Sequence, residues 1–120
     1  MNKLNYDYDM ENDSLFIYNI DQYNYEVSLE LDNDVILDID TEGKPVAFEF
    51  LNASKIFKLD KKHFQNIVKI NIQSSITEEA ISLKVKLITL IHDENQTFNV
   101  NRITSNLNNI PNMETELITV

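Results

Sequence analysis

Hydrophobic and polar residues alternate along most of this chain, and the alternation predicts β-strands. Three segments between positions 26 and 50 carry apolar residues at every second position, the period of half-buried strands. Segments over 4–8, 14–20, 68–73, 81–91 and 98–103 follow the same period. The stretches 51–55 and 60–64 lose the alternation and predict short helical turns, the second with Asp60 as its N-cap.

The segment 81–91 leaves a second interpretation open. A helix could begin near Thr77, with Glu78 and Glu79 in its first turn. The many β-branched residues and the long run of alternation favour a strand.

The pairing of the central strands follows from keeping their apolar residues on one face. A three-residue loop over 32–34 sets Leu29 opposite Leu37, and a loop over 41–44 then sets Leu37 opposite Phe48 and Ile39 opposite Val46. A one-residue slip would place charged residues in the apolar row. This meander is therefore the best-determined part of the predicted fold.

Gly43 is the only glycine of the chain and lies in the second of these loops. We interpret it as a structural turn residue that supplies a positive φ. Asp9 and Asp13 flank an earlier polar turn and are interpreted in the same way, as carboxylates that bond nearby backbone amides. A calcium loop is the alternative, but Asn12 stands where such a loop needs glycine.

Four carboxylates form the only candidate site: Glu30, Asp38, Asp40 and Glu49. The predicted pairing puts them on the outer face of the meander, with Glu26 beside Asp40. Paired carboxylates can serve as a general acid and base or bind a cation. No histidine or arginine lies near them in sequence, so a structural, solvent-exposed acidic face is the favoured interpretation. An acidic interaction surface is the next alternative, ahead of a catalytic or metal site.

The fold class predicted is mainly β: an antiparallel meander, sandwich or roll of about seven to eight strands with one or two short helical turns. One domain is expected over 1–104, with the meander and the strands before it over 6–55 and further strands over 56–104. The residues 105–120 are rich in asparagine and predict a tail or an edge strand.

The composition of the chain limits its location and the kinds of partner that it can bind. The chain of 120 residues has no cysteine, which excludes disulfides, and no apolar run that predicts a signal peptide or a membrane span, so a cytoplasmic location is expected. Residues 1–50 hold 13 carboxylates and two lysines, whereas the remainder holds seven carboxylates and eight basic groups. An acidic half disfavours nucleic acid and favours basic partners, cations or simple solubility. A solvated acidic surface that keeps a small protein soluble is the favoured one of these interpretations.

Two segments resemble a known family. Tyr8-Asp9 through Asp13-Ser14-Leu15-Phe16-Ile17, and Asp38 through Gly43 to Ala53-Ser54, look like the small prokaryotic proteins of the domain of unknown function 2283 family. Phe16 departs from the tyrosine usual there. The resemblance implies a small β-rich fold, no settled activity, and an antitoxin-like role beside a toxin-like partner.

The sequence therefore predicts a non-enzymatic protein-interaction module that forms homo-oligomers through exposed strand edges. An antitoxin-like acidic protein that binds a basic partner, and a cation-binding or hydrolytic protein that uses the surface carboxylates, are the alternatives. No cofactor or metal is expected, because His63 and His92 stand alone. The lysines at 55, 58, 61 and 62 are expected to pair with acidic groups more than with nucleic acid.

Overall fold

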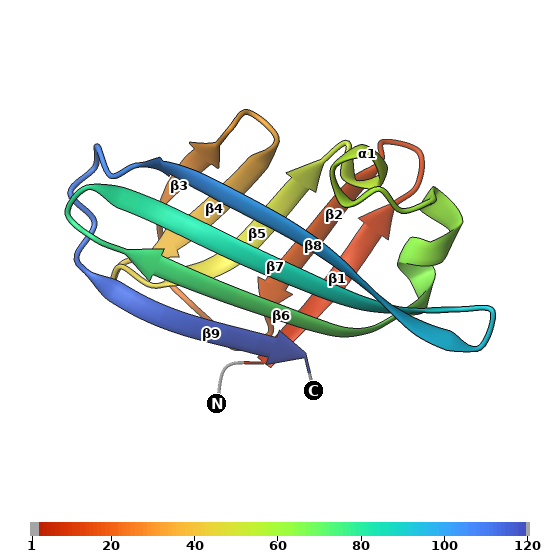
Figure 1. Ribbon diagram of the computed structural model, residues 1–120. Coiled ribbons are helices and arrows are strands. Elements are labelled where there is room, and N and C mark those ends of the chain that lie inside the picture. The colour runs from red at the N-terminus through yellow and green to blue at the C-terminus, as the bar shows by residue number, and fades with distance from the viewer. Residues whose placement is uncertain (1–2, 120) are drawn as a thin grey trace.

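The computed structural model describes residues 3–119, which form nine strands in one curled sheet together with two short helices (Figure 1). The strands are β1 (Lys3–Asp9), β2 (Ser14–Asn19), β3 (Tyr25–Leu31), β4 (Val35–Asp40), β5 (Pro45–Leu51), β6 (Ile67–Ile76), β7 (Ala80–Ile91), β8 (Glu94–Ser105) and β9 (Met113–Thr119). Helix α1 (Ala53–Phe57) and the 3₁₀ helix η1 (Lys61–Asn66) connect β5 to β6.

The sheet folds over into two layers. The strand order is β3-β4-β5-β2-β1-β9-β6-β7-β8, and the strands from β9 to β8 cross in front of those from β3 to β1 (Figure 1). Every pairing is antiparallel except that of β1 with β9, which is parallel and joins only two residue pairs. The predicted mainly β fold is confirmed, with nine strands in place of seven or eight.

The ninth strand comes from the C-terminal segment, for which the sequence suggested a tail or an edge strand. Residues 113–119 form β9, which pairs with β1 on one side and with β6 on the other. β9 is thus an inner strand of the sheet and joins the two layers. Leu117 anchors it in the core, whereas Val120 lies outside the described residues.

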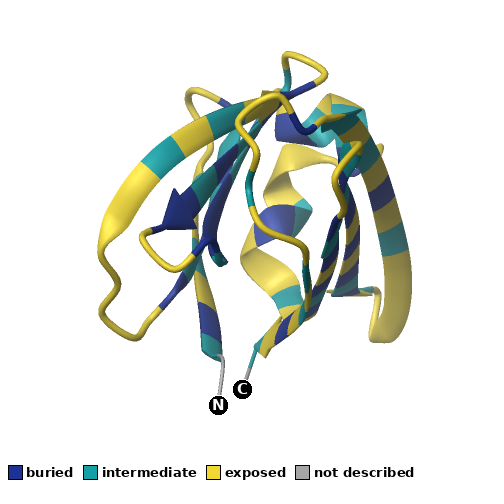
Figure 2. Cartoon of the chain, turned by 90° about the vertical axis from the view of Figure 1, so that its left-hand side faces the viewer, coloured by how far each residue is buried: buried dark blue, intermediate teal, exposed yellow. Residues whose placement is uncertain are grey.

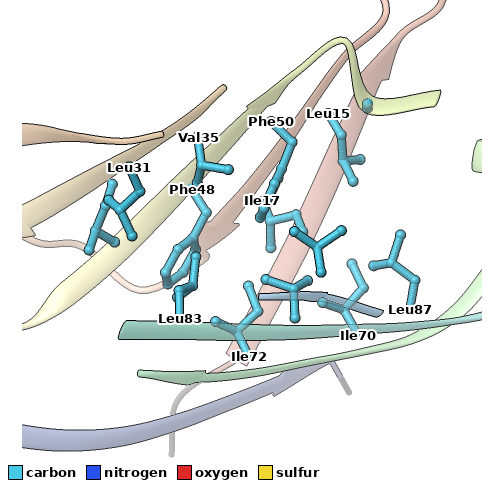
Figure 3. Close-up of a cluster of buried hydrophobic side chains, with 14 of the residues drawn as sticks. Leu15, Ile17, Leu31, Val35, Phe48, Phe50, Ile70, Ile72, Leu83 and Leu87 are labelled. Atoms are coloured by element: carbon cyan, nitrogen blue, oxygen red, sulfur yellow. The ribbon is translucent and has the colours of Figure 1, made fainter. Parts of the chain in front are cut away.

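The core lies between the two layers (Figure 3). Leu15, Ile17, Phe48 and Phe50 of the first layer face apolar side chains of the second, and Figure 3 shows Ile70, Ile72, Leu83 and Leu87 among them. Along the strands these buried positions alternate with exposed ones (Figure 2). Each large apolar side chain buried in this way stabilises the fold by about 1.5–3 kcal/mol, which makes the packing of one layer on the other the main source of stability.

The predicted pairing of the meander is confirmed for most of its length. Leu29 lies opposite Leu37, and Leu37 lies opposite Phe48. The prediction is wrong at the end of β4, where a bulge after Asp38 sets Ile39 opposite Pro45. Bulges add one residue to one strand, which a strict period of two does not predict.

Gly43 has the positive φ, 81°, that the loop over 41–44 was predicted to need, and its N–H donates to the carbonyl of Asp40 at 3.0 Å. The glycine also serves a second purpose. A Cβ at this position would lie 3.3 Å from Cδ of Pro111, in the segment that leads to β9. A side chain at this position would therefore press against the Pro111 ring, which would have to shift slightly.

The two helical turns lie where the sequence predicts them, and the alternative helix at Thr77 is wrong. Thr77 begins the tight turn between β6 and β7, and its N–H donates to the carbonyl of Ala80, the first residue of β7, at 2.9 Å. Among residues 3–119, no helix has the length and apolar character needed to cross a membrane.

Candidate functional site

The outer face of the first layer carries the predicted carboxylates together with aromatic side chains. It is built from two rows of cross-strand neighbours over β1, β2, β5, β4 and β3. The first row runs Asp7, Phe16, Glu49, Ile36, Glu30, and the second runs Asn5, Tyr18, Ala47, Asp38, Ser28. We call these ten residues the acidic–aromatic face.

Two aromatic rings of this face lie on β2, between β1 and β5. Phe16 and Tyr18 point outward because their neighbours Leu15 and Ile17 point into the core. The two rings stack with centroids 5.2 Å apart and an angle of 21° between their planes. Stacking limits the motion of both rings and holds a flat aromatic surface toward solvent.

Carboxylates flank the Phe16 ring, whereas Tyr18 lies between Asn5 and Ala47. Asp7 and Glu49 are the direct cross-strand neighbours of Phe16 on either side. Oγ of Ser14 donates to Oε2 of Glu49 at 3.1 Å, which orients that carboxylate. Neither row contains a lysine or an arginine, so the face combines aromatic surface with negative charge.

Asp38 is held by hydroxyl groups at the β3 side of the face. Oγ of Ser28 donates to Oδ1 of Asp38 at 2.7 Å, and the Tyr25 hydroxyl lies 2.8 Å from the same Oγ. Partial burial and then the charge of Asp38 raise the pKa of Tyr23 above its ordinary value. These contacts order the acidic group without neutralising it.

Asp40 does not belong to this face. Its side chain is buried, and Oδ1 accepts hydrogen bonds from the backbone N–H groups of Glu42 and Lys44, both at 2.9 Å. The predicted neighbour Glu26 is also wrong, because a bulge sets Tyr25 opposite Asp40. Of the four predicted carboxylates, the fold therefore brings Glu30, Asp38 and Glu49 to one face and uses Asp40 to shape the turn.

Asp9 and Asp13 differ in their surroundings although they flank the same turn. Asp9 is exposed and accepts hydrogen bonds from N–H and Nδ2 of Asn12, at 3.1 and 2.7 Å. Asp13 is buried, at 7% exposure, and binds Tyr8 and the sequence-distant Ser54. Its carboxylate accepts from the Tyr8 hydroxyl at 2.6 Å and from N–H and Oγ of Ser54 at 3.0 and 2.6 Å.

The Asp13 carboxylate fastens the start of α1 to the β1–β2 turn. Burial by itself raises the pKa of Asp13, but the hydrogen bonds from Ser54 and Tyr8 and the nearby charge of Lys61 outweigh it, so the pKa is lowered. Burial and the bond to Asp13 raise the pKa of Tyr8, which keeps its hydroxyl a donor. The Tyr8 ring stacks on Phe64 at 4.5 Å, which anchors η1 to the same point.

Comparisons with known proteins bear on both features. The model of a family described as protein of unknown function (DUF2283) matches residues 5–54. The uncharacterized protein MJ0789 of Methanocaldococcus jannaschii is 36% identical over 89 residues, which cover 73% of this chain and 75% of that protein. This chain belongs to the DUF2283 family.

A second relative of this DUF2283 chain carries a functional name. It is the Methanosarcina mazei protein named "Putative hypoxanthine phosphoribosyltransferase", 40% identical over 82 residues that cover 68% of this chain and 65% of that protein. No solved structure matches the chain.

The DUF2283 segment coincides with the first layer. It begins within β1, contains the whole acidic–aromatic face, and ends at Ser54, which donates to Asp13. The sequence resemblance had grouped Tyr8, Asp13 and Ser54, and the fold explains why they occur together: they form one hydrogen-bonded network. Sequence reasoning missed this network because its members lie up to 46 positions apart along the chain.

We next considered whether the described part of this DUF2283 protein contains a group of side chains that could bind a metal ion. Over residues 3–119, no group of three or more histidine or acidic side chains is placed to hold an ion. Glu30 and Glu49 are separated by Ile36 in their row. The carboxylates of the face are therefore arranged as a charged surface.

Proposed function

We propose that this protein is a non-enzymatic binding module whose acidic–aromatic face binds a lysine- or arginine-bearing segment of another protein. The observation that carries the proposal is the Phe16–Tyr18 ring stack, in which Phe16 lies between the carboxylates of Asp7 and Glu49. The two rows of this face contain no basic side chain. Rings and carboxylates arranged in this way attract a cation through both charge and the aromatic faces.

The charge of the whole chain supports the same partner class. A formal net charge of −10 repels phosphate backbones and speeds the approach of basic proteins. An exposed cation–π contact contributes only about 0.5–1 kcal/mol, so the two rings and the surrounding carboxylates must act together. An antitoxin-like role, in which the acidic layer neutralises a basic partner, is one form of this proposal.

Affinity capture with charge-reversed variants tests the proposal. The wild-type chain and Glu30→Lys/Glu49→Lys are used to capture proteins from an extract of the source organism, and a captured partner is then produced separately. We expect a basic partner that binds the wild type, loses at least tenfold in affinity with the variant, and binds more weakly as salt rises from about 50 to 300 mM.

A matched control separates the face from net charge. Glu78→Lys/Glu114→Lys makes the same change in charge on the β6–β9 half of the chain and should retain the partner. Equal loss of binding in both double variants, or binding that is independent of salt, would contradict the proposal.

Self-association is a second candidate, supported by the free edge of β8. This edge strand spans 12 residues, pairs with β7 without a bulge, and has Glu94 and Arg102 as its only charged residues. The other edge, β3, is interrupted by a bulge and carries Glu26 and Glu30. A long edge strand with few charges and no bulge favours pairing with another strand.

Light scattering over a range of concentrations tests this second candidate. We expect a dimer that dissociates when Asn99→Lys places a charge on the β8 edge, whereas Ser28→Lys on the β3 edge leaves it intact. A strict monomer at all concentrations would exclude self-association through β8.

The remaining activities receive less support. A phosphoribosyl transfer, as the name of the Methanosarcina mazei relative implies for that protein, requires a site for a diphosphate, which proteins often build from a glycine-rich loop at a helix N-terminus. The helices here span five and six residues, and the one glycine lies in the β4–β5 turn. A hydrolytic role for the face carboxylates lacks a paired acid and base.

A further inference from the structure

The outer face of the second layer differs chemically from the acidic–aromatic face. Lys84 on β7 lies between Gln73 of β6 and Asn101 of β8, and Lys86 lies between Asn71 and Asn99 in the next row. Each lysine is therefore flanked on both sides by an amide side chain. We call these six residues the amide–lysine surface.

This surface is hollowed. A depression of about 320 Å³ is lined by all six residues and by Glu116 of β9. Lys84 also lines the adjoining depression of about 410 Å³, together with Ser75 and Ser82. The twisted outer side of β9, β6, β7 and β8 thus offers a recess in which both ammonium groups are accessible to a small molecule.

The lysines of this recess have no internal partner. Oε2 of Glu116 already accepts from Nδ2 of Asn71 at 3.2 Å and from Nε2 of Gln73 at 3.0 Å. Among residues 3–119, neither Lys84 nor Lys86 makes a hydrogen bond or an ion pair. Two unpaired cations therefore lie beside four amides, of which Asn71 and Gln73 are oriented by the Glu116 carboxylate.

We propose that the amide–lysine surface binds a phosphate ester of a polyol, such as a sugar phosphate. Positions two apart on a strand are roughly 6.6 Å apart, so the ammonium groups of Lys84 and Lys86 can contact one phosphate from two sides. Lysine binds phosphate as a point charge. The four amides each offer a donor and an acceptor, which suits the hydroxyl groups of the same ligand.

A small ligand fits this surface better than a nucleic acid. The second layer carries only two lysines in the recess, with Glu114 and Glu116 beside them, and the chain as a whole is strongly acidic. Binding of a polyphosphate backbone requires many cations and a favourable long-range field. One phosphate group requires only the two local charges.

Titration of the full chain with glucose 6-phosphate, followed by ¹⁵N-resolved NMR, tests the inference. We expect saturable shifts of backbone amides in β6, β7 and β8, and at least tenfold weaker binding of glucose and of inorganic phosphate. Lys84→Gln/Lys86→Gln should weaken binding at least tenfold, whereas Lys84→Arg/Lys86→Arg should retain it. Lys61→Gln/Lys62→Gln, which makes the same charge change on η1, should bind like the wild type.

Four results would overturn the inference: no saturable shift, shifts centred on η1, equal weakening by the two glutamine variants, or equal affinity for inorganic phosphate and the sugar phosphate. Tighter binding of a single-stranded oligonucleotide to the same residues would also overturn the inference, because it would identify the ligand as a nucleic acid. All variants change exposed side chains, and an unchanged dispersion of the NMR spectrum verifies that each is folded.

Discussion

Arg102 and Asp34 form a bidentate ion pair across the open side of the curled sheet. Nε and one terminal nitrogen of the guanidinium donate to the two carboxylate oxygens at 2.9 and 2.6 Å. Arg102 lies on the edge strand β8, and Asp34 lies in the turn that follows the other edge strand, β3. The pair therefore connects the two ends of the sheet order. The hydrogen bond to Asp34 raises the pKa of Arg102 further above its ordinary value.

Loss of this pair should weaken the closure of the sheet. We expect Arg102→Ala to lower the free energy of unfolding by about 1 kcal/mol, since the pair is one-fifth exposed and solvent screens it. Arg102→Lys should recover little of this, because lysine lacks the forked geometry. Urea denaturation of Arg102→Ala, of Asp34→Ala and of the double variant measures the coupling, and strict additivity would contradict a direct interaction.

Replacement of Asp13 should lower the free energy of unfolding by more than replacement of Arg102. Asp13→Ala leaves the Tyr8 hydroxyl and the N–H and Oγ of Ser54 without their acceptor in a buried site, and we expect a loss of about 2–3 kcal/mol of unfolding free energy. Asp9→Ala, in the exposed part of the same turn, is the control and should cost less than about 1 kcal/mol. Similar losses in both variants, measured by thermal and urea unfolding, would contradict the network.

The Asp13 carboxylate should also make the free energy of unfolding depend on pH. The pKa of Asp13 is lower in the folded chain than its ordinary value of 3.8, so the stabilisation is complete above that value and is lost as the pH falls through the folded pKa. We expect Asp13→Asn to be less stable than the wild type at pH 7, with a difference that shrinks below about pH 4. Unfolding curves between pH 2 and 7 test this, and a constant difference would refute it.

Thr89 is a buried site where substitution by valine should increase the free energy of unfolding. Its side chain is fully buried on β7, and among residues 3–119 its Oγ1 is the one buried side-chain polar atom without a hydrogen-bond partner. Thr89→Val replaces the hydroxyl by a methyl group of similar size, and we expect a gain of about 1 kcal/mol. Thr89→Ala should instead destabilise by leaving a cavity. A melting temperature lowered by Thr89→Val would indicate that the hydroxyl has a partner.

Gly43 should tolerate no side chain without cost. Gly43→Ala forces a Cβ into a backbone conformation with φ of 81° and against Pro111, and we expect a loss of about 1–2 kcal/mol. Asparagine adopts positive φ more readily, so Gly43→Asn reports mainly the contact with Pro111. Combining each variant with Pro111→Ala separates strain from contact, because only the contact is relieved.

Local periodicity predicted much of the first layer because its pairings are local. The register through Leu29, Leu37 and Phe48 follows from short loops that keep apolar residues together. The bulge between Ile67 and Lys69 in β6 was not predictable in this way. It leaves Val68 exposed although alternation had grouped this residue with Ile70.

The candidate site was predictable only in part for the same reason. Glu30, Asp38 and Glu49 share a face because they lie on adjacent strands with simple alternation, whereas Asp40 turned inward to bind its own loop. Asp13 and Ser54 meet through the tertiary fold. No period within either segment encodes that contact, and the position of β9 between β1 and β6 depends in the same way on the whole chain.

The β1–β9 junction has a consequence for the rate of folding. Lys3 pairs with Ile118 and Leu4 with Thr119, so this contact closes a loop of nearly the whole chain, whereas the hairpins of each layer close loops of a few residues. The entropy lost on closure grows with loop length, and contacts of high sequence separation slow folding. We therefore expect the hairpins of the two layers to form rapidly. Formation of the parallel β1–β9 pairing between the layers should be the rate-limiting step of refolding.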